Sequence, residues 1–354
     1  MDRIGIMLDW ALMQKGIAGK QTYERLDYYA EIGKELGLEP VFFHPLHVDL
    51  KAKRVIGHFW NGTRLVPRAI RIPAVIHNRV LSGQPSTRAI IRQLSRHYKV
   101  YNELVVRDKG SVHQLLWKNE QLRPYLPKTR LFTRPTLVQF LGKFDVVYVK
   151  PAVGSVGEGV VRIERKGDRF LTVSSKLRKR TDKVRLMTAM RGWVGRRRFL
   201  VQQGIPLAKY QDRTFDVRVS VQRDGTREWC VSGMVAKVSN RYNKLSNLAR
   251  GGHAVPLDQV LASLFPQEKI AQVKSRLAVA ARMIAKEYAK HFPSLADLGL
   301  DMGIDREGNP YLIEVNVRDQ RYSFFEAGEL EMFKRTYRHP LEYGKSLFKQ
   351  SKNT

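Results

Sequence analysis

Three oxygen-bearing side chains late in the sequence, Asp301, Glu314 and Asn316, have the types and the spacing of a metal site. They lie in LGLDMGIDREGNPYLIEVN, where the turn REGN predicts a β-hairpin that pairs Asp301 with Glu314. Because side chains alternate along a strand, all three project from one face. Opposed carboxylates repel unless a positive charge lies between them, so this face suits Mg²⁺ or Mn²⁺ that also holds phosphates.

A second predicted hairpin, FDVRVSVQRDGTREWCVSGMVAKV, supplies cations and another carboxylate. Its turn at Asp224-Gly225 is a strong signal for two paired strands. Alternation places Asp216 and Arg218 on one face, and pairing about the turn brings Lys237 to the same face. Such a wall can bind ribose and stabilise the negative charge that develops on a transferring phosphoryl group.

Both hairpins also have interpretations without a ligand. The first is then an exposed face neutralised by nearby Lys and Arg, and the second is a salt-bridged sheet face. In either case we expect the opposite faces to be core, and they carry Leu300, Met302, Ile304, Ile313 and Val315 in the first hairpin and Phe215, Val217, Val219 and Val221 in the second.

A glycine-rich stretch, VYVKPAVGSVGEGVVRIER, follows Lys150 with Gly154, Gly157 and Gly159. Glycines let backbone N–H groups approach an oxyanion closely, so phosphate is the ligand that this spacing favours. The stretch is neither GxxxxGK[ST] nor a Rossmann fingerprint, because VVRIER after the last glycine favours a strand over a helix. We expect a strand, a glycine flap and a second strand that cover a nucleotide, with an ordinary hairpin as the alternative.

The elements that must position these residues follow from hydrophobic periodicity. Residues 1 to about 80 alternate the strands IGIML, PVFFHPL and PAVIHN with a helix around QTYERLDYYAEIGKELGL that ends at Gly37, which predicts an α/β unit. His77-Asn78-Arg79 ends the last of these strands, where an α/β sheet often binds a ligand; we expect a capping or turn role there, with ligand binding as the alternative. A helical pattern is predicted from about 85 to 123.

The second half of the chain is predicted to be strand-rich. From Phe199 to GGHAVPLDQV β segments dominate, and PQEKIAQVKSRLAVAARMIAKEYAKHF then predicts a long amphipathic helix. The last β segments lie between Leu298 and Val317, followed by a basic helical tail. At 354 residues, two or three subdomains are expected.

Composition limits the class of protein. A formal net charge of +30 attracts polyanions, and residues 165 to 198 hold thirteen Lys or Arg against two Asp. The single cysteine, Cys230, excludes an internal disulfide and a thiolate zinc cluster. We find no apolar run of membrane-spanning length, no signal-peptide pattern and no specific nucleic-acid motif, so we expect a soluble cytoplasmic protein.

Taken in order, the motifs resemble a known family. A Lys in RDKGSVHQLL, VYVK before the glycine flap, VQQGI, FDVRV, NLARGG, GLDMGID and LIEVN together resemble the ATP-grasp fold. Within that superfamily the sequence is similar to the YheC/YheD-type endospore coat-associated proteins, and more distantly to ribosomal-protein glutamate ligases and glutathione synthetases. The resemblance runs from about Arg107 to Val317, and the N-terminal unit is similar to a pre-ATP-grasp domain.

The resemblance implies a role for each matching residue. Lys109 and Lys150 would contact ATP phosphates under a flap from Gly154 to Gly159 that includes Ser155 and Gly157. Gln203 to Ile205 would face adenine, and Asp216 would lie near ribose. Arg218 and Lys237 would be catalytic groups near the γ-phosphate, and Asn247 and catalytic Arg250, with Gly251 and Gly252, would form a loop beside the acceptor. Asp301, Glu314 and Asn316 would hold Mg²⁺. One departure is Val317-Arg318-Asp319-Gln320, which replaces the Pro-Gly that commonly follows the metal-binding Asn.

The resemblance therefore implies an α+β / α/β architecture: an ATP-grasp fold over 101–354, with a lid at about 130–203 and a catalytic sheet at about 204–354, preceded by a small Rossmann-like domain over 1–100. It implies a carboxylate–amine (or thiol) ligase that uses Mg-ATP through an acyl phosphate, on a substrate that the basic surface predicts to be anionic or peptide-like. A spore-coat structural or binding protein with little turnover, in the mother-cell cytoplasm or coat, and a polyanion-binding protein are the alternatives.

Overall fold

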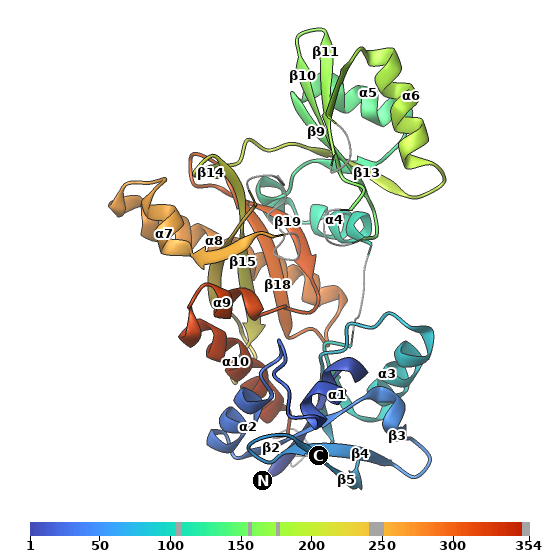
Figure 1. Cartoon of the computed structure of the whole chain (residues 1–354), viewed down its shortest axis with the longest axis vertical. Helices are drawn as coiled ribbons and strands as arrows, with labels where there is room; N and C mark the ends of the chain where they lie inside the picture. Colours follow the sequence, from blue (N-terminus) through green and yellow to red (C-terminus); the bar gives the residue numbers. More distant parts are fainter. Residues whose placement is uncertain (104–107, 155–157, 175–177, 241–250, 349–354) are drawn as a thin grey trace.

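The computed structural model describes residues 1–103, 108–154, 158–174, 178–240 and 251–348. Three β-sheets follow one another along the long axis of the molecule, with the N-terminal sheet at the bottom of Figure 1 and the lid at the top. Among the described residues, no helix has the length and apolar character needed to cross a membrane.

The N-terminal sheet has the strand order β3-β4-β2-β1-β6-β7, with β5 paired to β4. Its strands and helices are β1 (Asp2–Met7), α1 (Trp10–Ile17), α2 (Leu26–Glu35), β2 (Leu38–Phe43), β3 (Val48–Asp49), β4 (Arg54–Trp60), β5 (Leu65–Arg71), β6 (Val75–Asn78), α3 (Pro85–His97) and β7 (Lys99–Tyr101). β1 pairs in parallel with β2 and β6, as expected of an α/β unit. Gly37 follows the end of α2 with φ +71°, which explains the glycine at that position.

The predicted helical stretch from 85 to 123 is wrong in its middle. β7 interrupts it and pairs in parallel with β6. The helices on either side are α3 and α4 (Lys109–Trp117), and the 3₁₀ segment Glu120–Tyr125 comes after α4. Three residues are too few to show a period of two, so periodicity could not separate this strand from its helical neighbours.

The lid sheet has the order β12-β11-β10-β9-β13-β8. Its elements are β8 (Thr129–Leu131), α5 (Arg134–Lys143), β9 (Val146–Pro151), β10 (Val161–Lys166), β11 (Arg169–Val173), β12 (Arg178–Thr181), α6 (Lys183–Val194) and β13 (Phe199–Gln203). α5 and α6 form one apolar core with β9, β10 and β13. The basic stretch of the sequence supplies β11, β12 and α6, whose cations are largely exposed.

The catalytic sheet has the order β17-β16-β15-β18-β19, with β14 paired to β15. Its elements are β14 (Lys209–Tyr210), β15 (Arg213–Arg223), β16 (Trp229–Val238), β17 (His253–Pro256), α7 (Leu257–Ala262), α8 (Gln267–His291), β18 (Asp297–Ile304) and β19 (Pro310–Asn316). The predicted long helix is α8, and its apolar face packs on the apolar face of β15 and β18. The opposite face of the sheet carries Asp216, Arg218, Lys237 and Asp301.

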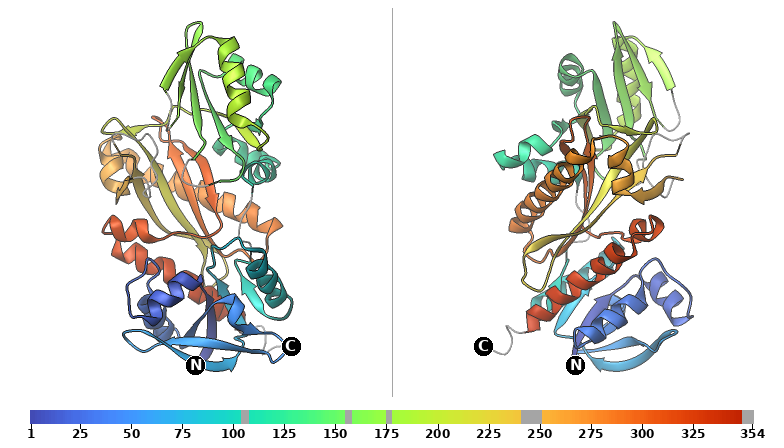
Figure 2. Two further views of the ribbon diagram at one scale, coloured as in Figure 1. Left: turned by 45° about the vertical axis from the view of Figure 1, so that its right-hand side comes forward. Right: turned by 90° about the vertical axis from the view of Figure 1, so that its left-hand side faces the viewer.

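Two C-terminal helices join the first and last sheets. α9 (Tyr322–Glu326) and the long α10 (Leu330–Phe348) complete the described chain. Figure 2 shows α10 between the N-terminal sheet and the catalytic sheet, and its Phe333, Tyr337 and Leu341 share one core with Ile4 of β1 and Val235 of β16. The C-terminal helix thus helps to hold the N-terminal unit in place.

Candidate active site

The hairpin of β18 and β19 has the predicted register at Asp301 and Glu314. Asp301 lies opposite Glu314, and Gly299 lies opposite Asn316. Between Asp301 and Met302 the register shifts by one residue, and this β-bulge pairs Met302 with Leu312. As a result Leu312 is buried and Ile313 is 37% exposed, so the prediction that Ile313 belongs to the core is wrong.

Asp301 is held by two cations and an amide. Arg218 Nε and Lys237 Nζ donate to its Oδ1 at 2.9 and 2.8 Å, and Asn316 Nδ2 donates to its Oδ2 at 3.2 Å. Burial acts to raise the pKa of Asp301, but the charges of Arg218 and Lys237 outweigh burial and hold this pKa well below its usual range. Asp301 is therefore a carboxylate whose charge is shared with two cations, as the ligand-free interpretation of this face foresaw.

The second hairpin brings its three polar residues to one face, as predicted. Asp216 pairs with Lys237 across β15 and β16, and Lys237 Nζ lies 2.8 Å from Asp216 Oδ1. Lys237 thus bridges Asp216 and Asp301. Burial acts to lower the pKa of Lys237, but the two carboxylates raise it above its ordinary value, so the group stays an ammonium.

Glu314 reaches a different cation. Its Oε1 lies 3.2 Å from Nζ of Lys109, the first residue of α4. The helix is capped by Asp108, whose Oδ1 accepts the N–H of Ser111 at 2.8 Å. The N–H of Lys109 donates to the carbonyl of Ala152 at 2.8 Å, so the start of α4 is tied to the end of β9.

Lys150 lies on β9 and points to the same place. Its Nζ donates to Gln202 Oε1 at 2.8 Å. Burial, and then the nearby charge of Lys109, lower the pKa of Lys150 to about 8. The sequence analysis missed Gln202 because β9 and β13 are separated by β10, β11, β12 and α6, and no turn signal reveals their pairing.

Gln203 is predicted to lie near adenine, but its side chain contacts Lys128. Its Oε1 accepts the N–H of Lys128 at 3.3 Å, and its own N–H donates to the carbonyl of Lys128 at 2.8 Å. Ile205 follows in the segment that leads from the lid to the catalytic sheet.

One small pocket gathers these groups between the lid and the catalytic sheet. Lys109, Lys150, Gln202 and Glu314 line it. Its apolar and aromatic walls are Val112, His113, Leu126, Leu312, Ile313 and Val315. The cavity measures about 60 Å³, which is smaller than a nucleotide.

The glycine flap follows β9. Gly154 and Gly159 have φ angles of +149° and +73°, which a residue with a side chain rarely adopts. A Cβ on Gly159 would also lie 2.9 Å from Pro151. Trp193 Nε1 donates to the carbonyl of Gly159 at 3.2 Å, so α6 supports the end of the flap. The predicted site residues Ser155, Gly157, Asn247 and Arg250 lie outside the described residues.

The segment that departs from the family pattern supports Arg218. Asp319 is fully buried and accepts from Arg218 Nη1 at 3.2 Å and from the hydroxyl of Ser220. The carbonyl of Gln320 accepts from the same Nη1 at 3.3 Å. Sequence reasoning marked this departure but gave Asp319 no role, and the structure makes it a positioning residue for the guanidinium.

A buried ionic cluster lies under this support. Arg79 Nη1 lies 2.9 Å from Asp297 Oδ2, which also lies 2.6 Å from Arg321 Nη2. Glu24 accepts from Arg79 as well. Asn78 caps a turn by accepting the N–H of Val80 at 3.1 Å, as expected, but the turn role expected of Arg79 is wrong because its side chain joins the two units.

The donor set suits a hard divalent cation. Asp301, Glu314 and Asn316 offer two carboxylates and one amide oxygen on one face, which is the oxygen chemistry of Mg²⁺ bound together with phosphates. No cluster of three or more His, Cys, Asp or Glu side chains capable of holding a metal occurs within the described parts of the chain.

Sequence comparison gives the family. The family described as YheC/D like ATP-grasp matches residues 97–347. The chain is 28% identical to the endospore coat-associated protein YheD of Bacillus subtilis (strain 168), over 68% of this chain and 54% of YheD, so it spans about half the length of that relative. It is 23% identical to YheC of the same organism, over 95% of this chain and 96% of YheC.

Solved structures share the fold at low identity. The D-cycloserine synthetase DcsG has a TM-score of 0.54 at 11% identity and covers 94% of this chain and 98% of its own. The VanG D-Ala:D-Ser ligase from Enterococcus faecalis has a TM-score of 0.54 at 12% identity, with 97% and 99% covered. A Chryseobacterium gregarium RiPP-associated ATP-grasp ligase, in complex with ADP and a leader and core peptide, has 0.51 at 14%, with 98% and 97% covered. With its sequence match over 97–347 and this fold, the chain belongs to the YheC/D-like ATP-grasp family.

Proposed function

We propose that this chain is an ATP-dependent ligase that binds Mg-ATP between the lid and the catalytic sheet. The observation that carries the proposal is the convergence of Lys109, Lys150 and Glu314 on one pocket, next to Asp301. Two cations there suit phosphates, and the carboxylates suit the metal that accompanies them. Neighbours in fold that are ligases, such as VanG, support the same reaction class.

The residues of the lid would bind the nucleotide. Lys109 and Lys150 would leave Glu314 and Gln202 to contact phosphate oxygens, and the backbone from Gly154 to Gly159 would close over them. The backbone from Gln203 to Ile205 would face adenine. Asp216 was expected near ribose, but its contact with Lys237 favours a role in holding that ammonium.

Asp301, Glu314 and Asn316 would hold Mg²⁺. When bound, the ion would supply positive charge that neutralises part of the charge on the phosphates. Release of Lys109 from Glu314 to the phosphates would free that carboxylate, while Arg218 and Lys237 keep Asp301 ionised and in place.

The chemistry would proceed in two steps. A substrate carboxylate oxygen attacks the γ-phosphorus and the bond to ADP breaks, which gives an acyl phosphate and ADP. An amine, or a thiol, then attacks the carbonyl carbon, and phosphate leaves as the nucleophile loses its proton. Arg218 and Lys237 would stabilise the charge that develops in both steps, since they are fixed before the reaction begins.

Substrate class and setting belong to the same proposal. The net charge of +30 favours an anionic or peptide-like substrate. The names of YheD and YheC as endospore coat-associated proteins support a place in the mother-cell cytoplasm or at the coat. Binding without turnover is a second candidate, favoured by the cations that already neutralise Asp301.

Release of ADP tests turnover. The protein is incubated with Mg-ATP, hydroxylamine and a panel of amino acids and peptides that bear a free carboxylate, and ADP and hydroxamate are measured together. The ligase proposal expects ADP and hydroxamate in equal amounts with at least one anionic member. Tight nucleotide binding without ADP release for the whole panel would favour the binding protein, and acceptance of only neutral or cationic members would refute the anionic substrate.

A further inference from the structure

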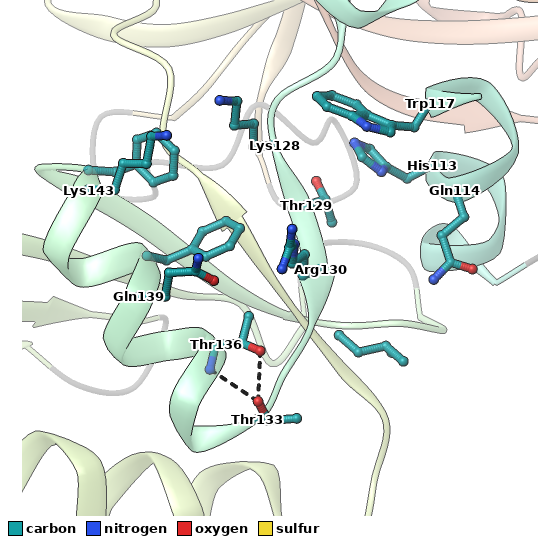
Figure 3. A pocket seen from close by; sticks show the side chains of 13 residues that line it. His113, Gln114, Trp117, Lys128, Thr129, Arg130, Thr133, Thr136, Gln139 and Lys143 are labelled. Carbon is teal, nitrogen blue, oxygen red and sulfur yellow. Dashed lines mark hydrogen bonds between the residues drawn. The ribbon is translucent and has the colours of Figure 1, made fainter. Parts of the chain in front are cut away.

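A second and larger cleft shares His113 with the nucleotide pocket. It measures about 670 Å³ and is formed by α4, β8 and α5 (Figure 3). Trp117, Phe140 and Phe144 give it aromatic walls. A cavity of this size is within the usual range for ligand sites. His113 lines both this cleft and the nucleotide pocket, so the two are neighbours.

The polar lining of the cleft has one sign of charge. Lys128, Arg130 and Lys143 line it, and none of its lining residues is Asp or Glu. All three cations are exposed, and none forms an ion pair with another described residue. In Figure 3 Arg130 lies on the strand between the side chains of α4, which include Trp117, and those of α5, which include Lys143. Unpaired cations beside aromatic rings suit an anionic ligand that also has apolar parts.

One wall of the cleft is an open strand edge. β8 is the last strand of the lid sheet, and on its other side no strand pairs with it in the described part of the chain. The carbonyl of Lys128 and the N–H of Phe132 bond to β13. Because backbone groups alternate in direction along an antiparallel strand, those of Thr129 and Leu131 face away from β13, along the open edge.

We propose that this cleft docks an extended acidic peptide segment, which adds as a further strand to β8. An added strand would satisfy the outward backbone groups of Thr129 and Leu131, and its alternate side chains would reach the three cations and the aromatic walls. A nucleotide or nucleic acid supplies charge but no matching row of backbone donors and acceptors. The strand edge therefore selects a peptide among anions.

Docking is distinct from the proposed reaction and does not depend on it. The cleft is nonetheless linked to the nucleotide pocket, because Gln202 donates to Thr129 Oγ1 at 2.8 Å and accepts from Lys150 at 2.8 Å. A strand added at Thr129 would lie one side chain away from the lysine expected at the phosphates.

Fluorescence anisotropy with the full chain tests the proposal. The probe is a short fluorescein-labelled peptide of alternating Glu and Val, titrated at low salt without nucleotide. Arg130→Glu with Lys143→Glu is expected to weaken binding by about tenfold or more. The matched control is Lys179→Glu with Arg180→Glu, on β12 at the opposite edge of the same sheet, and a change of less than about twofold is expected there.

Two further probes separate the specific features of the proposal. A peptide with the same side chains but N-methylated at alternate residues cannot add to a strand edge and is expected to bind about tenfold more weakly. A saturating ATP analogue is expected to leave peptide binding in place. No binding by the wild-type chain, equal losses in the two double variants, equal binding of the N-methylated peptide, or full competition by the analogue would each overturn the proposal.

Discussion

Lys150 is the residue whose chemistry depends most on its surroundings. Burial and the charge of Lys109 lower the pKa of its ammonium to about 8, and Gln202 is its hydrogen-bond partner. A phosphate placed beside it would stabilise the charged form and raise that pKa again. Nucleotide binding and protonation of Lys150 are therefore linked.

This linkage predicts proton uptake on binding. Near pH 9 the free protein has Lys150 largely neutral, whereas the phosphate-bound form has it charged, so binding takes up close to one proton per site. Near pH 7 both forms are charged and uptake falls toward zero. Calorimetry with a non-hydrolysable ATP analogue in buffers of different ionisation enthalpy measures this directly.

Lys150→Met is the control for the assignment to this residue. The variant is expected to bind more weakly and to lose the proton uptake near pH 9. Uptake that persists in Lys150→Met, or that is absent in the wild type near pH 9, would contradict the assignment.

At the scale of elements, the two hairpins show what could be predicted. Asp301 opposite Glu314 and Asp216 opposite Lys237 follow from a turn close in sequence and a period of two, and the structure confirms both pairs. The prediction that Ile313 faces the core failed, because a β-bulge shifts the register near the turn and changes which side chains face the core.

Contacts between distant segments could not be predicted in the same way. Gln202 meets Lys150 across 52 positions and Arg79 meets Asp297 across 218, with no turn that fixes their register. The β8 edge and the support of Arg218 by Asp319 also depend on strand order and tertiary packing. Hydrophobic patterns specify faces of elements, not which face meets which.

The packing of α10 gives a prediction at this scale. A Cβ on Gly344 would overlap Ile4 Cδ1 and lie 2.9 Å from Tyr101 Oη, so Gly344→Ala forces these buried side chains or α10 itself to move. We expect a loss of about 1–3 kcal/mol in the free energy of unfolding, measured by urea denaturation.

Gly192→Ala in α6 is the matched control. No atom lies within 4 Å of a Cβ at that position, and alanine favours the helix, so the variant is expected to be unchanged or more stable by about 0.5–1 kcal/mol. Equal effects of the two substitutions would contradict the account of α10 packing.

For the whole molecule, the buried ionic cluster joins the N-terminal unit to the catalytic sheet. Asp297 lies between Arg79 of the first unit and Arg321. Arg79 also donates to the backbone carbonyl of Asp319, and the carboxylate of Asp319 accepts from Arg218. The position of the N-terminal unit is thus connected by direct contacts to a proposed catalytic cation.

Removal of Asp297 tests this joint. Asp297→Ala removes one of the two carboxylates, the other being Glu24, that neutralise the buried guanidiniums of Arg79 and Arg321. A loss of about 3–5 kcal/mol in the free energy of unfolding is expected from urea denaturation. Asp258→Ala, which removes an exposed pair with Lys274 at 2.8 Å, is expected to cost less than about 1 kcal/mol. A similar small cost for both would show that the cluster does not stabilise the joint.

The central claim, that Mg-ATP binds between the lid and the catalytic sheet, is tested most directly by titration calorimetry. Wild type, Lys150→Ala, Glu314→Gln and the control Lys179→Ala on β12 are titrated with a non-hydrolysable ATP analogue, with and without Mg²⁺. We predict micromolar, Mg²⁺-dependent binding that Lys150→Ala and Glu314→Gln each weaken by about tenfold or more and that Lys179→Ala leaves within about twofold. No binding with Mg²⁺, or binding that neither Lys150→Ala nor Glu314→Gln affects, would contradict the account.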